Sequence, residues 1–126
     1  MNIPSGLKYT KEHEWIKIEG RLATVGITDY AQGELGDVVF VELPRVGEVV
    51  KQMAPFGTIE AVKAVSDLFS PVSGTVVGVN LALDNDPAAV NRDPYGDGWM
   101  VKIELSNAAE VGQLLDAAGY QSLVGL

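Results

Sequence analysis

The sequence predicts a mainly β fold, with antiparallel sheets arranged as a sandwich or a barrel in a single domain. Short β-prone segments follow one another at short intervals, Gly and Pro residues stand between them, and no long helical pattern separates them. The 126 residues suffice for one substantial core and are too few for two ordinary domains.

The strands are predicted from alternating patterns and from runs of β-branched residues. In chain order, strands are expected over residues 15–18, 21–27, 38–43, 47–50, 75–79 and 100–105, with one short helix over 29–35. Glu19-Gly20 has the composition of a hairpin turn between the first two strands, and Pro44 ends the third. In the last strand Val101, Ile103 and Leu105 share one face, which is typical of a half-buried antiparallel strand.

A second helix is predicted near the C-terminus. Asn107 has the position of an N-cap, Glu110 follows three residues later, and apolar residues then recur at helical spacing. We expect a helix over about 108–118, within a closing segment of about 107–120, and Gly119 as its end.

Composition and charge exclude several classes of function. The chain has no cysteine, so disulfides, thiolate metal sites and cysteine nucleophiles are excluded. Nine basic residues stand against 17 acidic ones, and the net charge of −8 disfavours nucleic acid and favours basic faces of partner proteins. Neither a membrane-spanning run nor a targeting segment is evident, so we expect a cytoplasmic protein, with a mature mitochondrial form as the alternative.

The sequence contains no complete motif for catalysis or metal binding. No phosphate-binding loop is present, and the aspartates in loops 84–87 and 93–98 lack the offsets of a calcium-binding loop, so no metal site is expected. His13, the only histidine, lies between Glu12 and Glu14, but no nucleophile accompanies it, and we interpret it as an ordinary surface histidine. An enzyme acting alone is therefore the least favoured class of function.

One lysine stands out by its isolation. Lys63 is the only basic residue between Lys51 and Arg92, and acids lie three residues before it, at Glu60, and four after it, at Asp67. A Schiff-base lysine needs a neutral amine, in a buried site or beside another cation, whereas Lys63 has acids beside it. It remains a suitable acceptor for a ligase that supplies an activated acyl group.

The alternative for Lys63 is a solvated lysine on an ordinary helix. Ile59, Val62 and Val65 recur at three-residue spacing, and no Gly, Pro or Asn marks a turn at Lys63. Taken by themselves, these residues favour this alternative over a modified lysine.

Six segments read together change the interpretation. They are residues 9–15 (YTKEHEW), 26–32 (GITDYAQ), 35–44 (LGDVVFVELP), 60–67 (EAVKAVSD), 70–74 (SPVSG) and 93–99 (DPYGDGW). Together they closely resemble the H proteins of the glycine cleavage system, in the same order along the chain, from about Leu7 to Leu105.

The resemblance implies a fold and a cofactor. The fold is a barrel-sandwich hybrid of two antiparallel sheets, as in lipoyl and biotinyl carriers, in one domain over 1–126 with a core of about 7–105. Lys63 is placed at an exposed hairpin tip, which replaces the helical interpretation of residues 59–65. Lipoate in amide linkage to Lys63 supplies the sulfur that the chain lacks.

The resemblance also implies a carrier and not an enzyme. The partners are a pyridoxal-phosphate glycine decarboxylase (P protein), a tetrahydrofolate-dependent aminomethyltransferase (T protein), dihydrolipoyl dehydrogenase (L protein), and a lipoyl ligase or lipoyl/octanoyl transferase. The carrier moves the aminomethyl group of glycine from the first enzyme to the second, and the third reoxidises the arm. Neither nucleic acid nor membrane is an expected partner, and the protein is expected to be a monomer.

Further site residues follow from the resemblance. The ligase is expected to recognise Glu60, Val62 and Ala64. The loaded arm is expected to dock on Glu14 and Asp67, and on Glu12, where the family varies. One departure is Ala61, where serine is commoner in the family, and we expect modification to persist at a changed rate.

Other carriers and other classes fit less well. A lipoyl domain of an α-keto acid dehydrogenase would have Asp immediately before the lysine, and a biotin carrier would have Met on both sides, whereas Val62 and Ala64 stand here. From a different class, a lipoyl-relay donor or a non-catalytic binding module with the same fold remains the alternative.

Overall fold

The computed structural model describes residues 1–125, so Leu126, the last residue of the predicted domain, lies outside the described range. The strands are β1 Lys8–Tyr9, β2 Glu14–Glu19, β3 Leu22–Ile27, β4 Val38–Glu42, β5 Val49–Val50, β6 Pro55–Ala61, β7 Val65–Phe69, β8 Gly74–Val79 and β9 Val101–Leu105. The helices are α1 Asp29–Leu35, α2 Ala89–Arg92 and α3 Ala117–Leu123, with 3₁₀ turns η1 Leu81–Asp84 and η2 Ala108–Gln113. The predicted mainly β fold is confirmed.

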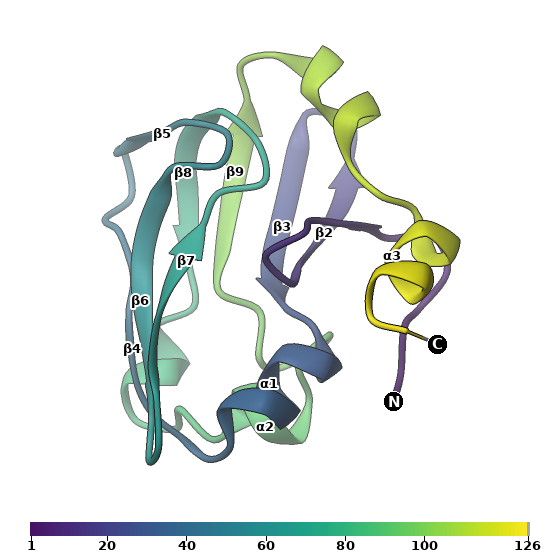
Figure 1. Ribbon diagram of the computed structural model, residues 1–126. Helices are drawn as coiled ribbons and strands as arrows, with labels where there is room; N and C mark the ends of the chain where they lie inside the picture. Colours follow the sequence, from purple (N-terminus) through teal and green to yellow (C-terminus); the bar gives the residue numbers. More distant parts are fainter. Residues whose placement is uncertain (126) are drawn as a thin grey trace.

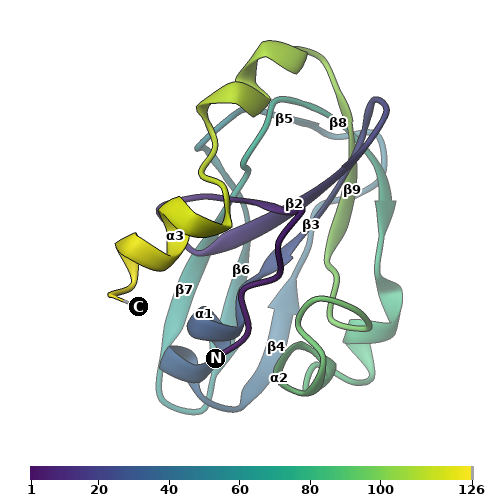
Figure 2. The ribbon, with the colours of Figure 1, turned by 90° about the vertical axis from the view of Figure 1, so that its right-hand side faces the viewer.

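Two antiparallel sheets build the molecule. One has six strands in the order β1-β2-β3-β9-β8-β5, and the other has three in the order β4-β6-β7. The β6–β7 hairpin extends to the end of the molecule at which α1 and α2 lie (Figure 1). Both chain ends lie on one side, where α3 packs beside β1 and β2 (Figure 2).

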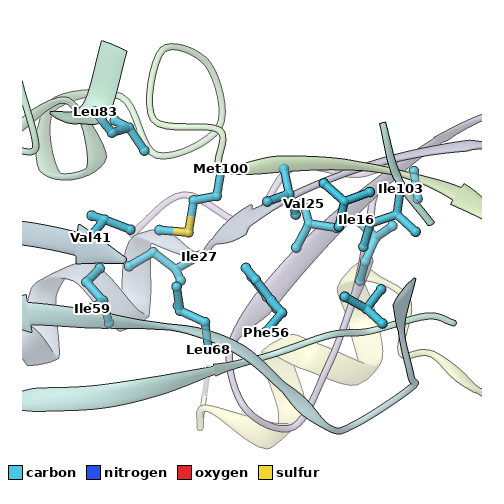
Figure 3. Packing of buried hydrophobic residues seen from close by; sticks show 14 of the residues in the cluster. Ile16, Val25, Ile27, Val41, Phe56, Ile59, Leu68, Leu83, Met100 and Ile103 are labelled. Atoms are coloured by element: carbon cyan, nitrogen blue, oxygen red, sulfur yellow. The ribbon is translucent and has the colours of Figure 1, made fainter. Parts of the chain in front are cut away.

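The core lies between the inner faces of the two sheets. Along β9, Val101, Ile103 and Leu105 are buried while Lys102 and Glu104 are not, as the alternating pattern predicts. Buried side chains from both sheets meet there, among them Ile16, Val25, Ile27, Val41, Phe56, Ile59, Leu68, Met100 and Ile103 (Figure 3).

The helical interpretation of residues 59–65 is wrong, and the hairpin that replaced it is confirmed. Ile59 and Ala61 are buried while Glu60 between them is exposed, which is the period of a strand. The Ala61 N–H donates to the Ala64 carbonyl over 2.7 Å and closes the turn that carries Lys63.

The single helix predicted over 108–118 is also wrong. The chain forms η2, becomes extended at Leu114, and begins α3 only after Asp116, whose side chain accepts a hydrogen bond from Gly119 N–H at 2.8 Å. Leu115 exchanges two backbone hydrogen bonds of 2.8 and 2.9 Å with Tyr9, and this pairing interrupts the helix. Gly119 therefore lies inside α3 and does not end a helix.

The short helix over 29–35 is confirmed. Thr28 caps it, because its side-chain oxygen accepts the Ala31 N–H at 3.2 Å. Gly36 ends it with a φ of 81°, a conformation that glycine adopts without strain. Across residues 1–125, the helices are all too short or too polar to span a membrane.

Candidate functional site

Lys63 lies at the tip of the β6–β7 hairpin and is exposed. Its neighbour Val62 is 74% exposed, and Ala64 is partly exposed. The tip is fixed by the backbone, since the Val62 N–H donates to the Asp37 carbonyl over 3.0 Å, in addition to the bond within the turn. An amine held in this way on an ordered turn can enter the active site of another protein.

Gly36 gives room to the Lys63 side chain. A Cβ atom at Gly36 would lie 3.1 Å from Lys63 Cε and 3.8 Å from Cδ, so the lysine chain passes close to the C-terminal end of α1. The absence of a side chain at Gly36 thus serves both the helix end and the path of the lysine.

A pocket of about 310 Å³ lies against the same helix. The segment before β2, the helix α1 and the strand β7 supply most of its wall. Its lining residues are Glu12, His13, Glu14, Ile27, Tyr30, Ala31, Glu34, Leu35, Ile59, Ser66, Asp67 and Leu68. Apolar side chains and four carboxylates therefore share one cavity.

Glu14 is the most deeply placed of these carboxylates. Only 1% of the residue is exposed, and its carboxyl group accepts hydrogen bonds from Thr10 Oγ1 at 2.5 Å and from the Phe69 N–H at 3.2 Å. Burial raises the pKa of Glu14 to about 8, against the smaller opposing effect of these hydrogen bonds. A cation entering the pocket would stabilise the ionised carboxylate.

The structure brings the three predicted docking acids to one cavity. Asp67 is exposed on β7 and Glu12 is exposed in the loop before β2. Both line the same pocket as the buried Glu14. Glu60, predicted for ligase recognition, lies elsewhere, exposed on β6 opposite Phe40 and Val65.

His13 is not the surface histidine that the sequence predicted. It is partly buried with a φ of 71°, its Nδ1 lies 2.8 Å from the Tyr120 hydroxyl, and its ring packs on Tyr30 with centroids 4.8 Å apart. Sequence reasoning missed Tyr120 and Thr28 as its partners. No spacing signal could have found Tyr120, because it lies 107 residues further along the chain.

The arrangement suits a tethered group that carries a positive charge. Lys63 offers an amine that can form an amide with a carboxylic acid cofactor, and its side chain passes Gly36, which directly follows the pocket residue Leu35. Among residues 1–125, no group of three or more His, Cys, Asp or Glu side chains is placed to hold a metal ion.

Comparisons with known proteins agree with this geometry. A family model described as "Glycine cleavage H-protein" matches residues 7–125. The chain is similar to the glycine cleavage system H protein of Symbiobacterium thermophilum, with 59% identity over 121 residues, 96% of this chain and 94% of the relative. The same protein of Bacteroides fragilis is 56% identical over 124 residues, 98% of each chain. The crystal structure of a glycine cleavage system H protein from Mycobacterium marinum has a TM-score of 0.90 and 45% identity, over 98% of this chain and 100% of that one.

Proposed function

Because this chain belongs to the glycine cleavage H-protein family, we propose that it is a lipoyl carrier and that the lipoyl group is attached to Lys63 through an amide bond. The observation that carries this proposal is the exposed Lys63 amine on a fixed hairpin tip, beside Gly36 and an acidic pocket. The chain has no cysteine, so no thiol of its own would trap the disulfide of the arm.

The proposed partners are the other components of the glycine cleavage system and the enzyme that attaches the cofactor. When bound, the lipoyl group would supply a disulfide able to take up the aminomethyl group of glycine at the decarboxylase. The aminomethyltransferase would then pass the one-carbon unit to tetrahydrofolate and release ammonia, and dihydrolipoyl dehydrogenase would reoxidise the remaining dithiol. We place this carrier in the cytoplasm, as a monomer that visits each enzyme in turn.

The protein's own residues tether and shelter the arm in this proposal. Lys63 holds it at high local concentration near each docked enzyme. Glu14, Asp67 and Glu12 bind the ammonium end of the loaded arm, because carboxylates favour a cation in a cavity that excludes part of the water.

The residues around Lys63 serve the attaching enzyme in this proposal. Val62 and Ala64 flank the lysine with short side chains that leave its amine accessible, and Glu60 is an exposed acid close to the tip. Ala61 is buried at the end of β6 and points into the fold, so we expect its effect on attachment to be indirect.

Intact mass spectrometry tests the attachment. After co-expression with a lipoyl ligase in medium containing lipoate, we expect the mass to rise by one lipoyl group and peptide mapping to place it on Lys63. Lys63→Arg should fold normally, because the residue is exposed, and should stay unmodified and abolish glycine decarboxylation in a reconstituted system.

Lys51→Arg is the matched control, since Lys51 is also an exposed lysine outside the hairpin tip. It should be lipoylated like the unaltered protein. A Lys63 that stays bare under these conditions would favour a binding module, and full glycine decarboxylation by Lys63→Arg would remove the carrier proposal altogether.

A further inference from the structure

The Tyr120 hydroxyl joins three segments that surround the acidic pocket. It lies 2.8 Å from His13 Nδ1, in the segment before β2, and 2.7 Å from Thr28 Oγ1, at the start of α1. Tyr120 itself comes from α3, and both Tyr120 and Thr28 are fully buried. The C-terminal helix thereby contacts the wall of a pocket formed by much earlier residues.

The hydrogen bonds that link Thr28, Tyr120 and His13 have one favourable assignment of donors and acceptors. Thr28 Oγ1 accepts the Ala31 N–H as the N-cap of α1, so its own hydrogen needs a separate acceptor. Among the hydrogen bonds of residues 1–125, the Tyr120 oxygen is the only acceptor within reach of that hydroxyl. Thr28 therefore donates to Tyr120, and Tyr120 donates its single hydrogen to the histidine ring.

The reverse order leaves a buried donor unpaired. If His13 Nδ1 donated to Tyr120, then Tyr120 would donate to Thr28, and the Thr28 hydrogen would have no acceptor in a fully buried position. Unpaired buried donors are costly and rare in proteins. His13 is thus held as the neutral tautomer that carries its proton on Nε2.

The surroundings of His13 act on its charge in both directions. Burial lowers the pKa of His13, while the nearby carboxylates of Glu12 and Glu34 act in the opposite direction. Tyr30 covers one side of the ring, and Glu14 lines the same pocket. Despite this acidic setting, the balance favours the neutral ring, in agreement with the hydrogen-bond order.

We propose that Tyr120 is a positioning residue that keeps His13 uncharged, so that the pocket accepts the ammonium group of the loaded arm without repulsion. This inference rests on the proposed carrier function. An imidazolium at His13 would oppose the attraction that Glu14 and Asp67 offer to the same ammonium group.

Nitrogen NMR of the unmodified protein tests the hydrogen-bond order directly. His13 is the only histidine in the chain, so its imidazole signals need no assignment. We expect the Nε2–H tautomer in the unaltered protein. Tyr120→Phe keeps the aromatic ring stacked on Tyr9, removes the donor to Nδ1, and should raise the titration midpoint of His13 by about half a pH unit or more.

Two matched variants separate this role from general packing. Tyr95→Phe also removes a tyrosine hydroxyl at the start of α1, where it accepts a hydrogen bond from the Asp29 N–H at 3.0 Å. This hydroxyl does not contact His13, so we expect the titration of His13 to stay unchanged in Tyr95→Phe. Thr28→Ser keeps the hydroxyl and should preserve the tautomer. An Nδ1–H tautomer in the unaltered protein, or an identical titration in Tyr120→Phe, would overturn the inference.

Release of the amine from the loaded, lipoylated protein tests the consequence for docking. Between pH 8 and pH 6, Tyr120→Phe should release it increasingly faster than Tyr95→Phe, by about threefold to tenfold at the lower pH. Glu14 titrates over this range in both variants, so the difference between them isolates His13. Equal release rates at every pH would overturn the role of His13 charge. Failure of the carrier function would instead appear as the absence of a lipoyl mass shift. The nitrogen NMR experiment is independent of that outcome, because it uses the unmodified protein.

Discussion

At the scale of single residues, Glu14 is an acid in a position that disfavours its charge. Its carboxyl group is buried, accepts two hydrogen bonds, and is not part of either ion pair found among residues 1–125. Burial raises its pKa to about 8 from an ordinary value of 4.5. The folded protein therefore holds a proton on Glu14 over a range in which the unfolded chain has lost it.

This shift predicts how stability depends on pH. The contribution of Glu14 is fully present below pH 4.5 and is lost as the pH rises through about 8. Glu14→Gln cannot ionise, so its stability relative to the unaltered protein should increase between pH 5 and pH 9, by on the order of 3 kcal/mol. Urea denaturation at several pH values measures this difference.

An exposed acid outside the pocket supplies the control for that experiment. Glu48→Gln should not show this pH-dependent gain over the unaltered protein, because Glu48 is exposed and is not among the groups that shift the pKa of Glu14. If the free energies of unfolding of Glu14→Gln and the unaltered protein changed in parallel with pH, burial would not raise the pKa of Glu14 in the folded state.

Two acids of the pocket, Glu14 and Asp67, should differ in their effect on the loaded arm. Glu14→Ala should leave lipoylation of Lys63 intact and shorten the lifetime of the aminomethylated arm by about tenfold, because its carboxylate acts in a shielded site. Asp67→Ala should shorten it by only about twofold to fivefold, because Asp67 is exposed. Ammonia release from the loaded protein provides the measurement, and an unchanged rate in Glu14→Ala would remove it from the docking site.

Residue-level reasoning from the sequence succeeded only for some parts of this site. Lys63 stood out by its isolation and by its place in a resembling segment, and the structure puts it on an exposed tip. The burial of Glu14 and the partners of His13 could not be predicted, because burial and the Tyr120 contact depend on segments that meet only in the folded chain.

At the scale of elements, the helix α1 illustrates how two glycines in one segment differ. Gly36 ends the helix with a φ of 81° and faces the Lys63 side chain, whereas Gly33 lies inside the helix with open space around it. Gly36→Ala should destabilise the fold by about 1 kcal/mol, because an L side chain is strained at positive φ. Thermal or urea denaturation measures the change.

Gly33→Ala is the matched control and should change stability with the opposite sign. Alanine inside a helix is favoured over glycine by roughly 0.5–1 kcal/mol. A loss of stability in both variants would mean that α1 tolerates no added methyl group. The positive φ of Gly36 would then not explain the effect of Gly36→Ala.

Element prediction from the sequence was most reliable where one force decided the conformation. The strand β9 was predicted correctly, because its alternating faces match a half-buried strand. The predicted C-terminal helix was interrupted because Leu115 pairs with Tyr9, a contact that local spacing does not contain. Residues 59–65 have a helical spacing, and the resemblance alone selected the hairpin.

At the scale of the whole molecule, the protein has two separate clusters of buried side chains. The main core lies between the sheets, while a second cluster of Tyr9, Trp15 and Tyr120 joins the N-terminal strands to α3. The stacked rings of Tyr9 and Tyr120, with centroids 4.8 Å apart, form the centre of the second cluster. The hairpin that carries Lys63 contributes to the main core only.

This division predicts that the two ends of the molecule respond independently to damage in the second cluster. Tyr120→Ala removes a fully buried aromatic ring and should cost about 3 kcal/mol. Because α3 contacts the rest of the fold mainly through that ring and β1, its amides should lose hydrogen-exchange protection first, together with those of β1. Amides of β6 and β7 should keep theirs, and Lys63 should still be lipoylated, since the hairpin that carries it contributes only to the main core. Hydrogen exchange with mass spectrometry, and intact mass after co-expression with the ligase, measure both outcomes on one preparation. Loss of protection in β6 and β7 at the same rate as in α3 would mean that the two clusters unfold as one unit.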